Sequence, residues 1–218
     1  MRKVRKQFFL YTKVLALLVL SLLLLAGCGA EKNMKKAEKF MAIGEYYDAA
    51  SQYKQAYSKT PPKERDRRGL IAGKMAVCYR KINSTPKAVA AYRNMVRYNK
   101  ATVDDRLELG RQLLKNGDYK QAEEQFRVVL DSMPDNVLAR NGLLSAQQAP
   151  AWKKQGSRYT VKRMDVFNSR RAEYSPMLSG DQFDQLYFTS TRNDATGDEL
   201  SGITGTKNGD IFVSQKDD

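Results

Sequence analysis

The chain has 218 residues, of which 42% are hydrophobic and 28% charged, and it carries a formal net charge of +14. It contains no histidine, which excludes the commonest general base and the commonest metal ligand. The basic surplus suits lipid headgroups or acidic wall polymers, but acids alternate with the basic residues and no nucleic-acid-binding motif accompanies them, so we expect no nucleic-acid partner.

The first 27 residues have the order of a secretory signal. A basic segment ending at Lys6 precedes an apolar run over residues 10–26, which closes on small residues. Five basic residues lie in this segment, which leaves +9 for the rest of the chain. The segment ends Leu25-Ala26-Gly27-Cys28 and resembles the lipobox of bacterial lipoproteins. The alternative, an uncleaved transmembrane helix, needs roughly 20 apolar residues and leaves the small residues before the cysteine unexplained.

The resemblance implies that residues 1–27 are removed and that Cys28 carries a covalent diacylglyceryl group and an N-acyl chain. Two or more acyl chains hold a protein stably at a membrane, whereas a single chain does not. Gly29 follows the cysteine where an aspartate would favour retention in the inner membrane. The resemblance therefore implies a lipid-anchored protein of the outer membrane that faces the periplasm, with no other cofactor.

Three segments that follow repeat one pattern of small and aromatic residues. Each contains a small residue, a turn residue, a second small residue and, four positions later, an aromatic residue. The three sets are Ala37, Gly44, Ala49 and Tyr53; Ala76, Asn83, Ala88 and Tyr92; and Gly110, Gly117, Ala122 and Phe126. The turn residues of the second and third sets are 34 positions apart, and five additional residues within 64–69 lengthen the first interval to 39.

This pattern resembles the tetratricopeptide repeat (TPR) family, whose repeats are pairs of antiparallel helices with a period of 34. Small residues let the two helices approach, glycine adopts the positive φ of the turn, and the aromatic residue fills the gap to the next repeat. Pro61 and Pro134 close the second helices of repeats one and three. Repeat two diverges, because Asn83 replaces glycine, Thr85 replaces tyrosine and no proline closes it, but asparagine tolerates the left-handed conformation.

The sequence therefore predicts an α-helical TPR solenoid of three repeats over residues 33–149, preceded by a short tether at 28–32. The amphipathic segment 136–148 is expected to cap the stack with Val137, Leu138 and Leu144 facing inward. Cys78 lies in the first helix of repeat two, and we interpret it as a small buried hydrophobic residue, not as a redox group.

In TPR proteins the first helix of each pair lines the concave face of the solenoid. The resemblance implies that this face contains Met34, Glu38, Met41, Arg80, Lys81, Leu107, Arg111 and Lys115. A basic strip of this kind suits an acidic peptide or a terminal carboxylate. The alternative is that these charges are only solvated, on a stack that serves as a spacer.

Helical periodicity stops after Pro150, and residues 150–158 have the composition of a linker. Strand-type alternation follows at 159–164, 185–190 and 210–214. Residues 174–192 resemble the blade motif of WD40-like (PD40) β-propellers, with Gly180-Asp181 in place of the usual Asp-Gly. Because a propeller needs at least four blades, we expect 159–218 to be an incomplete blade of a longer protein. The acidic loop 193–199 lacks the spacing of a calcium loop, so we predict a solvated turn and no metal site.

The order of lipobox, repeats and propeller start is similar to that of the OmpA-family lipoproteins of the Bacteroidetes, of which the PorE-like subgroup belongs to type IX secretion. The resemblance implies a scaffold that binds other envelope proteins and that reaches peptidoglycan only if an OmpA-like domain follows. We predict no enzyme, because the sequence has no Gly-x-Ser-x-Gly motif, no Walker loop and no carboxylates at catalytic spacing. The alternative is an accessory lipoprotein for glycan or nutrient uptake.

Overall fold

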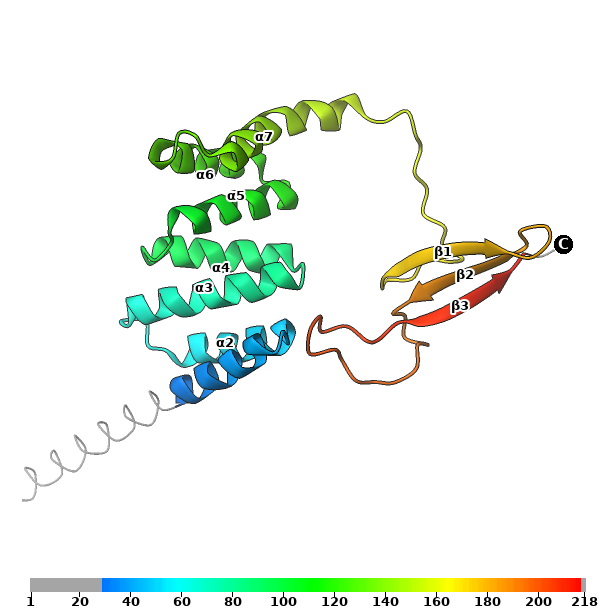
Figure 1. The fold of residues 1–218 in the computed structure, drawn as a ribbon, viewed down its shortest axis with the longest axis horizontal. Helices are drawn as coiled ribbons and strands as arrows, with labels where there is room; N and C mark the ends of the chain where they lie inside the picture. Colours follow the sequence, from blue (N-terminus) through cyan, green and yellow to red (C-terminus); the bar gives the residue numbers. More distant parts are fainter. Residues whose placement is uncertain (1–28, 217–218) are drawn as a thin grey trace, which may run out of the picture. The chain divides into compact units, whose positions relative to one another are not determined.

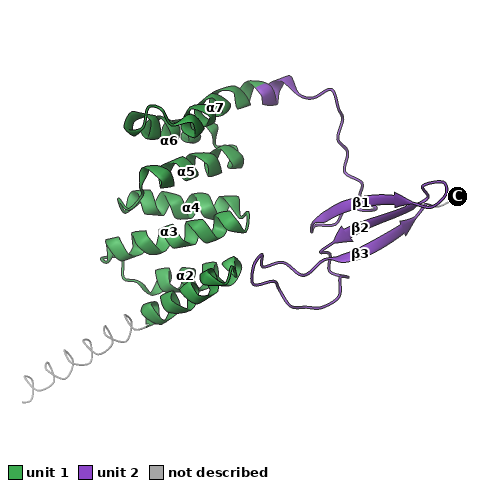
Figure 2. Cartoon of the chain, in the orientation of Figure 1, with its two compact units in different colours: residues 1–151 green, residues 152–218 purple. Residues whose placement is uncertain are grey.

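The computed structural model describes residues 29–216, so the predicted signal segment and Cys28 lie outside the described residues. The chain divides into two compact units, the first ending at Ala151 and the second beginning at Trp152 (Figure 2). Within residues 29–216, none of the helices combines the length and the apolar character needed to cross a membrane.

The first unit is a stack of antiparallel helices (Figure 1). Its described part begins with a helix over residues 29–42. It continues with α2 (Tyr46–Lys59), α3 (Arg65–Lys81), α4 (Thr85–Arg97), α5 (Val103–Asn116), α6 (Tyr119–Ser132) and α7 (Val137–Gln155). Each helix from α2 to α5 packs on the next one in the chain. Three helix pairs and a further helix therefore form the predicted α-helical solenoid of the TPR type.

The turns within the pairs have the predicted backbone conformation. Gly44 and Gly117 adopt φ values of +82° and +85°, and Asn83 adopts +60° at the corresponding position of the second pair. Asn99, with φ +55°, follows α4. The helix α4 is the second helix of its pair and has no closing proline. Asn99 can end it instead, because asparagine enters the left-handed region more readily than most side chains.

Small residues and aromatic side chains hold the pairs together. Ala37, Ala76 and Ala88 are fully buried, and so is the aromatic residue Phe126. A Cβ atom added to Gly110 on α5 would lie 2.7 Å from the Phe126 ring, and one added to Gly142 on α7 would meet the same ring. Phe126 therefore fills the space between its own pair and α7, as the repeat pattern predicts for this position.

The contact face predicted for the capping helix is wrong. Val137, Leu138 and Leu144 are 59%, 59% and 50% exposed. The buried side of α7 instead carries Ala139 and Ala146. A face that approaches the Phe126 ring through Gly142 has little room for large side chains, so Val137, Leu138 and Leu144 lie on other sides of the helix.

Both ends of the solenoid are more helical than the sequence indicates. The first helix already includes residues 29–32, which we expected to be part of a tether. At the other end, α7 continues through Pro150 to Gln155, so most of the predicted linker 150–158 is helical. Proline removes one backbone hydrogen bond, which weakens the helix there without ending it.

The second unit contains a three-stranded antiparallel sheet in the order β1 (Glu173–Ser179), β2 (Gln185–Ser190) and β3 (Asp210–Gln215). The strands predicted at 185–190 and 210–214 are confirmed. The strand predicted at 159–164 is wrong: Tyr159 and Val161 are 83% and 93% exposed and pair with nothing. Alternation of apolar and polar residues is not sufficient to form a strand, because the backbone N–H and C=O groups of a strand need a neighbouring strand as hydrogen-bond partner.

The strand β1 instead contains the Ser175-Pro176 motif. Its register with β2 is irregular between Tyr174 and Met177, and Ser175 adopts φ +53°. A bulge at this place accommodates Pro176, which has no backbone N–H to donate to the ladder.

Phe188 on β2 is the centre of this unit's small core and is 6% exposed. Its ring stacks on Phe212 with centroids 5.9 Å apart and meets the edge of Phe167 at 6.2 Å. The Arg192 guanidinium lies 5.0 Å and 4.8 Å from the Phe188 and Phe212 centroids. It also pairs with Glu173 at 3.7 Å, so aromatic and charged contacts together close one face of the sheet.

We expect Phe126→Ala to lower the free energy of unfolding by about 3–5 kcal/mol, because it leaves a cavity between α5 and α7. Urea unfolding followed by far-ultraviolet circular dichroism measures this loss. Val128→Ala on the same helix is the control, because Val128 is 39% exposed and its truncation should change the value by less than about 0.5 kcal/mol. Equal losses in the two variants would contradict the packing described for Phe126.

Candidate functional site

The first helices of the three pairs (residues 29–42, α3 and α5) carry the residues predicted to bind a partner; we call their shared surface the first-helix face. Charged contacts join successive members of this set. Arg67 on α3 pairs with Glu31 of the first helix at 2.9 Å. Arg80 on α3 lies 3.6 Å from Glu108 on α5. Each contact crosses from one repeat to the next, so the spacing of charges on this face is fixed by the stacking of the repeats.

Two of the predicted arginines share one carboxylate. The Nε atom of Arg80 is 3.6 Å from one oxygen of Glu108, and Nη1 of Arg111 donates to the other oxygen at 2.9 Å. Glu108 was not among the predicted residues, because spacing in the sequence does not show that α3 and α5 present these side chains to each other. One acid holds two cations in place, and the group keeps a net positive charge.

The two predicted lysines are held by neutral partners. Lys115 donates to the side-chain oxygen of Asn83, in the turn of the preceding repeat. The Lys81 ammonium lies 5.7 Å from the centre of the Tyr46 ring at the start of α2. Both side chains are exposed and neither contact neutralises the charge, so the first-helix face stays basic.

The apolar residues predicted for this face are less accessible. Leu107 is 7% exposed and belongs to the core, which corrects its assignment to a binding surface. It shares its side of α5 with the buried Gly110, three positions further on. Met34 and Met41 are half-buried against the core, whereas Glu38 is exposed. These predicted apolar residues therefore contribute less accessible surface to the face than the predicted charged residues do.

A further cluster, which the sequence analysis missed, lies at the long turn between the first two pairs. Arg68 donates from Nε to the Tyr98 hydroxyl at 3.0 Å and from Nη1 to the Thr60 carbonyl at 2.7 Å. Its guanidinium also stands 4.1 Å from the centre of the Tyr57 ring. The additional residues within 64–69 supply Arg68, but its partners are distant in sequence, so no local pattern reveals the cluster.

This cluster shifts the ionisation of Tyr98. The hydrogen bond with Tyr57, followed by the hydrogen bond and charge of Arg68, lowers the pKa of Tyr98 to about 8. Burial has the opposite effect in the core, where it raises the pKa of Tyr53 to about 12.

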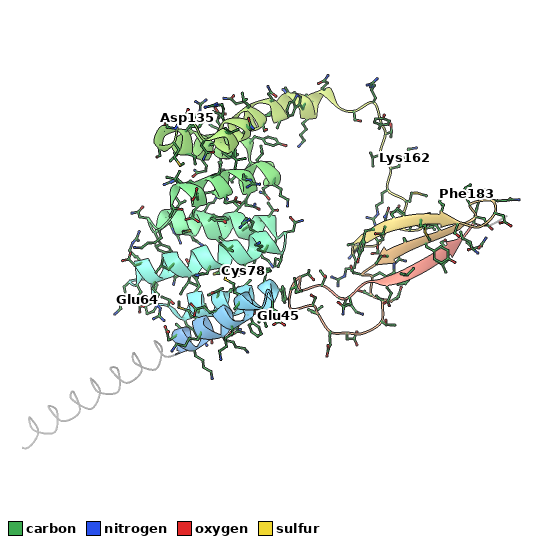
Figure 3. The ribbon with its side chains drawn as sticks, in the orientation of Figure 1. Glu45, Glu64, Cys78, Asp135, Lys162 and Phe183 are labelled. Atoms are coloured by element: carbon green, nitrogen blue, oxygen red, sulfur yellow. The ribbon has the colours of Figure 1, made fainter. Side chains whose placement is uncertain are left out.

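Burial also raises the pKa of the Cys78 thiol on α3 to about 11 (Figure 3). The residue is fully buried, which agrees with its interpretation as a small core residue.

The acidic loop 193–199 of the second unit holds an internal cation. Lys207 donates to the carbonyl oxygens of Asn193 and Ala195, each at 3.1 Å, and pairs with Asp198 at 3.4 Å. The lysine ammonium is therefore held by two backbone carbonyl oxygens and one carboxylate of this loop. Among residues 29–216, no three histidine, cysteine, aspartate or glutamate side chains gather as metal ligands would.

No protein-family model matches the chain. No curated protein matches it either. Among solved structures, the first TPR of Spaghetti (RPAP3) bound to HSP90 peptide SRMEEVD has 20% identity and a TM-score of 0.47, over 58% of this chain and 96% of that one. The C-terminal TPR-containing domain of a Plasmodium falciparum FK506-binding protein has 19% identity and a TM-score of 0.48, over 60% and 94%. The Sgt2 TPR domain from Aspergillus fumigatus has 18% identity and a TM-score of 0.44, over 65% and 91%.

We expect one tyrosine of the folded protein to ionise near pH 8, in a titration followed by tyrosinate absorbance. The pKa of Tyr98 is lowered on folding, so between about pH 8 and 10 the unfolded chain holds more protons. The contribution of Tyr98 to the free energy of unfolding should therefore rise with pH across this window, and it is lost as the pH falls below about 8. Cys78, whose pKa is raised by burial, contributes with the opposite sign above about pH 9, so the contribution of Tyr98 is read from the difference between the wild type and Tyr98→Phe.

Arg68→Ala should move this ionisation toward the ordinary tyrosine value near 10. Arg93→Ala is the control, because Arg93 contacts Asp118 and Gln121 and not Tyr98. If the two variants titrate alike, Arg68 does not set the pKa of Tyr98.

Proposed function

We propose that this protein is a membrane-anchored scaffold that binds other envelope proteins through its helix-pair solenoid. The observation that supports this most directly is the set of exposed cations on the first-helix face. Lys81, Arg111 and Lys115 are each held by a contact with a neighbouring side chain. Side chains that are already positioned lose less entropy on binding, so such a face can recognise a partner without first being ordered.

The partner segment that fits this face is acidic. Arg111 offers a planar guanidinium that can bind a carboxylate with two hydrogen bonds, whereas Lys115 acts as a point charge one helical turn further on. Because Leu107 is buried, it offers no apolar surface to a partner beside Arg111. We therefore infer that charge, more than apolar contact, selects the partner.

We also propose that Cys28 is the lipid-modified first residue of the mature chain, that the lipid holds it at the outer membrane, and that it faces the periplasm. The lipobox at Leu25–Cys28 supports this, and so does the start of the solenoid directly after it, since the described helix already includes Gly29. An anchor next to the first helix keeps the repeats close to the membrane surface.

For the second unit we propose a blade of a WD40-like propeller. The three-stranded meander supports this, because Met177, Ile211 and Val213 are 59%, 76% and 59% exposed on its strands. Apolar side chains of this kind are covered when blades pack face to face. The proposal extends to the architecture of the OmpA-family lipoproteins, with a role in type IX secretion and a link to peptidoglycan through an OmpA-like domain.

A photo-crosslinking amino acid in place of Arg111 or Lys115 should form adducts with envelope proteins in the intact cell, whereas the same amino acid at Lys54 or Lys120 should not. The last two are exposed lysines on second helices and form matched controls. Combining Arg111→Glu with Lys115→Glu should reduce partner recovery roughly tenfold, because like charges repel an acidic segment.

The double change Lys54→Glu and Lys120→Glu should leave recovery unchanged. Adducts of equal yield at the first-helix positions and at the control positions Lys54 and Lys120 would overturn the proposed binding surface. Adducts formed only with soluble glycans would favour the uptake alternative.

Cys28→Ser should release the protein from the membrane fraction, or leave it as the unprocessed precursor. Globomycin, which blocks cleavage of lipoprotein signals, should cause the wild-type chain to accumulate with residues 1–27 attached. Cys78 offers no second attachment site, because it is fully buried. A Cys28→Ser chain that is processed normally and stays in the membrane would refute lipid anchoring.

A further inference from the structure

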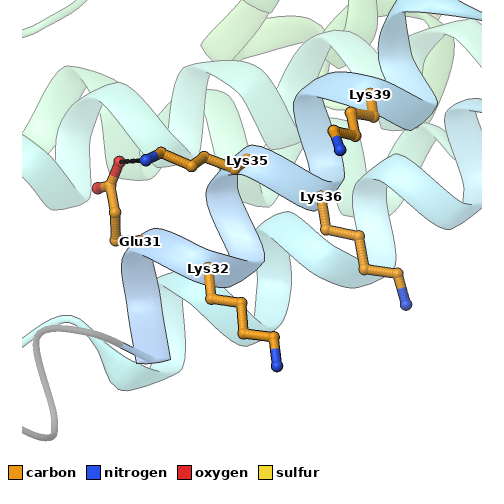
Figure 4. Close-up of a pocket in the computed structure, with 5 residues that line it drawn as sticks. All are labelled: Glu31, Lys32, Lys35, Lys36 and Lys39. Carbon is orange, nitrogen blue, oxygen red and sulfur yellow. Dashed lines mark ion pairs between the residues drawn. The ribbon is translucent and has the colours of Figure 1, made fainter.

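One face of the first helix carries a concentration of lysines (Figure 4). Lys32, Lys35, Lys36 and Lys39 are all exposed. At 3.6 residues per turn they fall within an arc of about 100° around the helix. The buried residues of the same helix, Ala30, Asn33 and Ala37, lie on the opposite side. The lysine face, as we call these four residues, therefore points away from the core of the solenoid.

The lysine face has little internal compensation. Lys35 lies 4.0 Å from Glu31, but that carboxylate is closer to Arg67, at 2.9 Å. Lys36 lies 5.6 Å from the centre of the Phe40 ring, which leaves its charge intact. Within residues 29–216, Lys32 and Lys39 form no ion pair. This differs from Lys100 and Lys207, which pair with Asp66 and Asp198.

The distance of each lysine from the proposed anchor determines whether its charge can interact with the membrane surface. A helix rises 1.5 Å per residue, so Lys32 lies about 5 Å and Lys39 about 15 Å along the axis from Gly29, the residue that follows Cys28 in the sequence. At physiological salt the Debye length is about 8 Å. If the helix stood upright on the membrane, only Lys32 would lie within that length of the surface. If the helix lay along the membrane, all four lysines would.

A fifth lysine adds positive charge at the Gly29 end of this face. The Lys59 side chain, from the last turn of α2, runs alongside Gly29: its Cδ atom would lie 3.4 Å from a Cβ added to that glycine. Positive charge therefore extends from the residue next to Cys28 along the whole first helix.

We infer that the lysine face binds anionic phospholipid headgroups of the membrane that holds the anchor, so that the first helix lies along the membrane surface. This inference rests on the proposed lipidation of Cys28. Each lysine near an anionic surface contributes about 1 kcal/mol, or roughly fivefold, so the three lysines that only the flat orientation brings to the surface favour it by about 10²-fold. Because the buried side of the helix is opposite, the repeats extend away from the bilayer.

Lysine acylation followed by mass spectrometry tests this on the processed, full-length lipoprotein reconstituted into vesicles. In vesicles of phosphatidylcholine with 30% phosphatidylglycerol, acylation of the lysine face should be at least threefold slower than in phosphatidylcholine alone. Lys54 and Lys120 should react equally in both, and 1 M KCl should abolish the difference. The mass of the N-terminal peptide, read in the same experiment, reports whether Cys28 carries lipid.

The triple change Lys32→Gln, Lys36→Gln and Lys39→Gln should remove the protection of Lys35 by phosphatidylglycerol. The matched change Lys54→Gln, Lys120→Gln and Lys153→Gln, at three exposed positions elsewhere, should preserve it. Lipid on Cys28 with no protection of the lysine face would overturn the inference and leave the anchor intact. An unlipidated Cys28 would refute the anchor itself. Protection that follows an added soluble polyanion, and not the phosphatidylglycerol content, would contradict the assignment to headgroups.

Discussion

The close approach of helices at small residues is the constraint on which the rest of this structure depends. Ala37, Ala76 and Gly110 occupy the same place in successive first helices, and each lies where a larger side chain would separate the pair. The aromatic residues Tyr53 and Phe126 then fill the space that remains between repeats. Dense packing of this kind tolerates little change in volume, so it sets the distance between neighbouring first helices.

That distance in turn determines the charge pattern of the first-helix face. Arg80 reaches Glu108, and Arg67 reaches Glu31, only because successive first helices lie side by side. Exposed ion pairs contribute about 0–1 kcal/mol each, which is small beside the burial of one large aromatic side chain. The apolar contacts therefore stabilise the stack, whereas the charged contacts position the side chains that a partner or a membrane would meet.

Much of the solenoid could be predicted from the sequence, because each repeat provides a check on the positions assigned in the other two. Gly44, Asn83 and Gly117 recur at one place in three repeats, and all three adopt positive φ. Where no repeat supplied this check, some predictions were wrong. The face of α7 was misassigned because hydrophobicity alone favoured Leu138 and Leu144, whereas α7 approaches the Phe126 ring through Gly142 and buries Ala139 and Ala146.

The candidate site was harder to predict, because its contacts form between helices that are distant in the sequence. Lys81, Arg111 and Lys115 could be assigned to first helices, but their partners Tyr46, Glu108 and Asn83 depend on how the helices pack. The Arg68 cluster, with partners up to 30 positions away, has no local signal at all. In the second unit, alternation identified β2 and β3 but also suggested a strand at 159–164 that has no neighbour to bond.

The most direct test of the central constraint is amide hydrogen exchange on a Gly110→Leu variant. A Cβ at this position would lie 2.7 Å from the Phe126 ring, so the third pair must open to accommodate leucine. Contacts in a solenoid are between neighbours, so exchange should rise most in α5, α6 and α7 and least in α2. A uniform rise along all helices, or unchanged exchange in α5 and α6, would contradict an architecture held together by close approach at small residues.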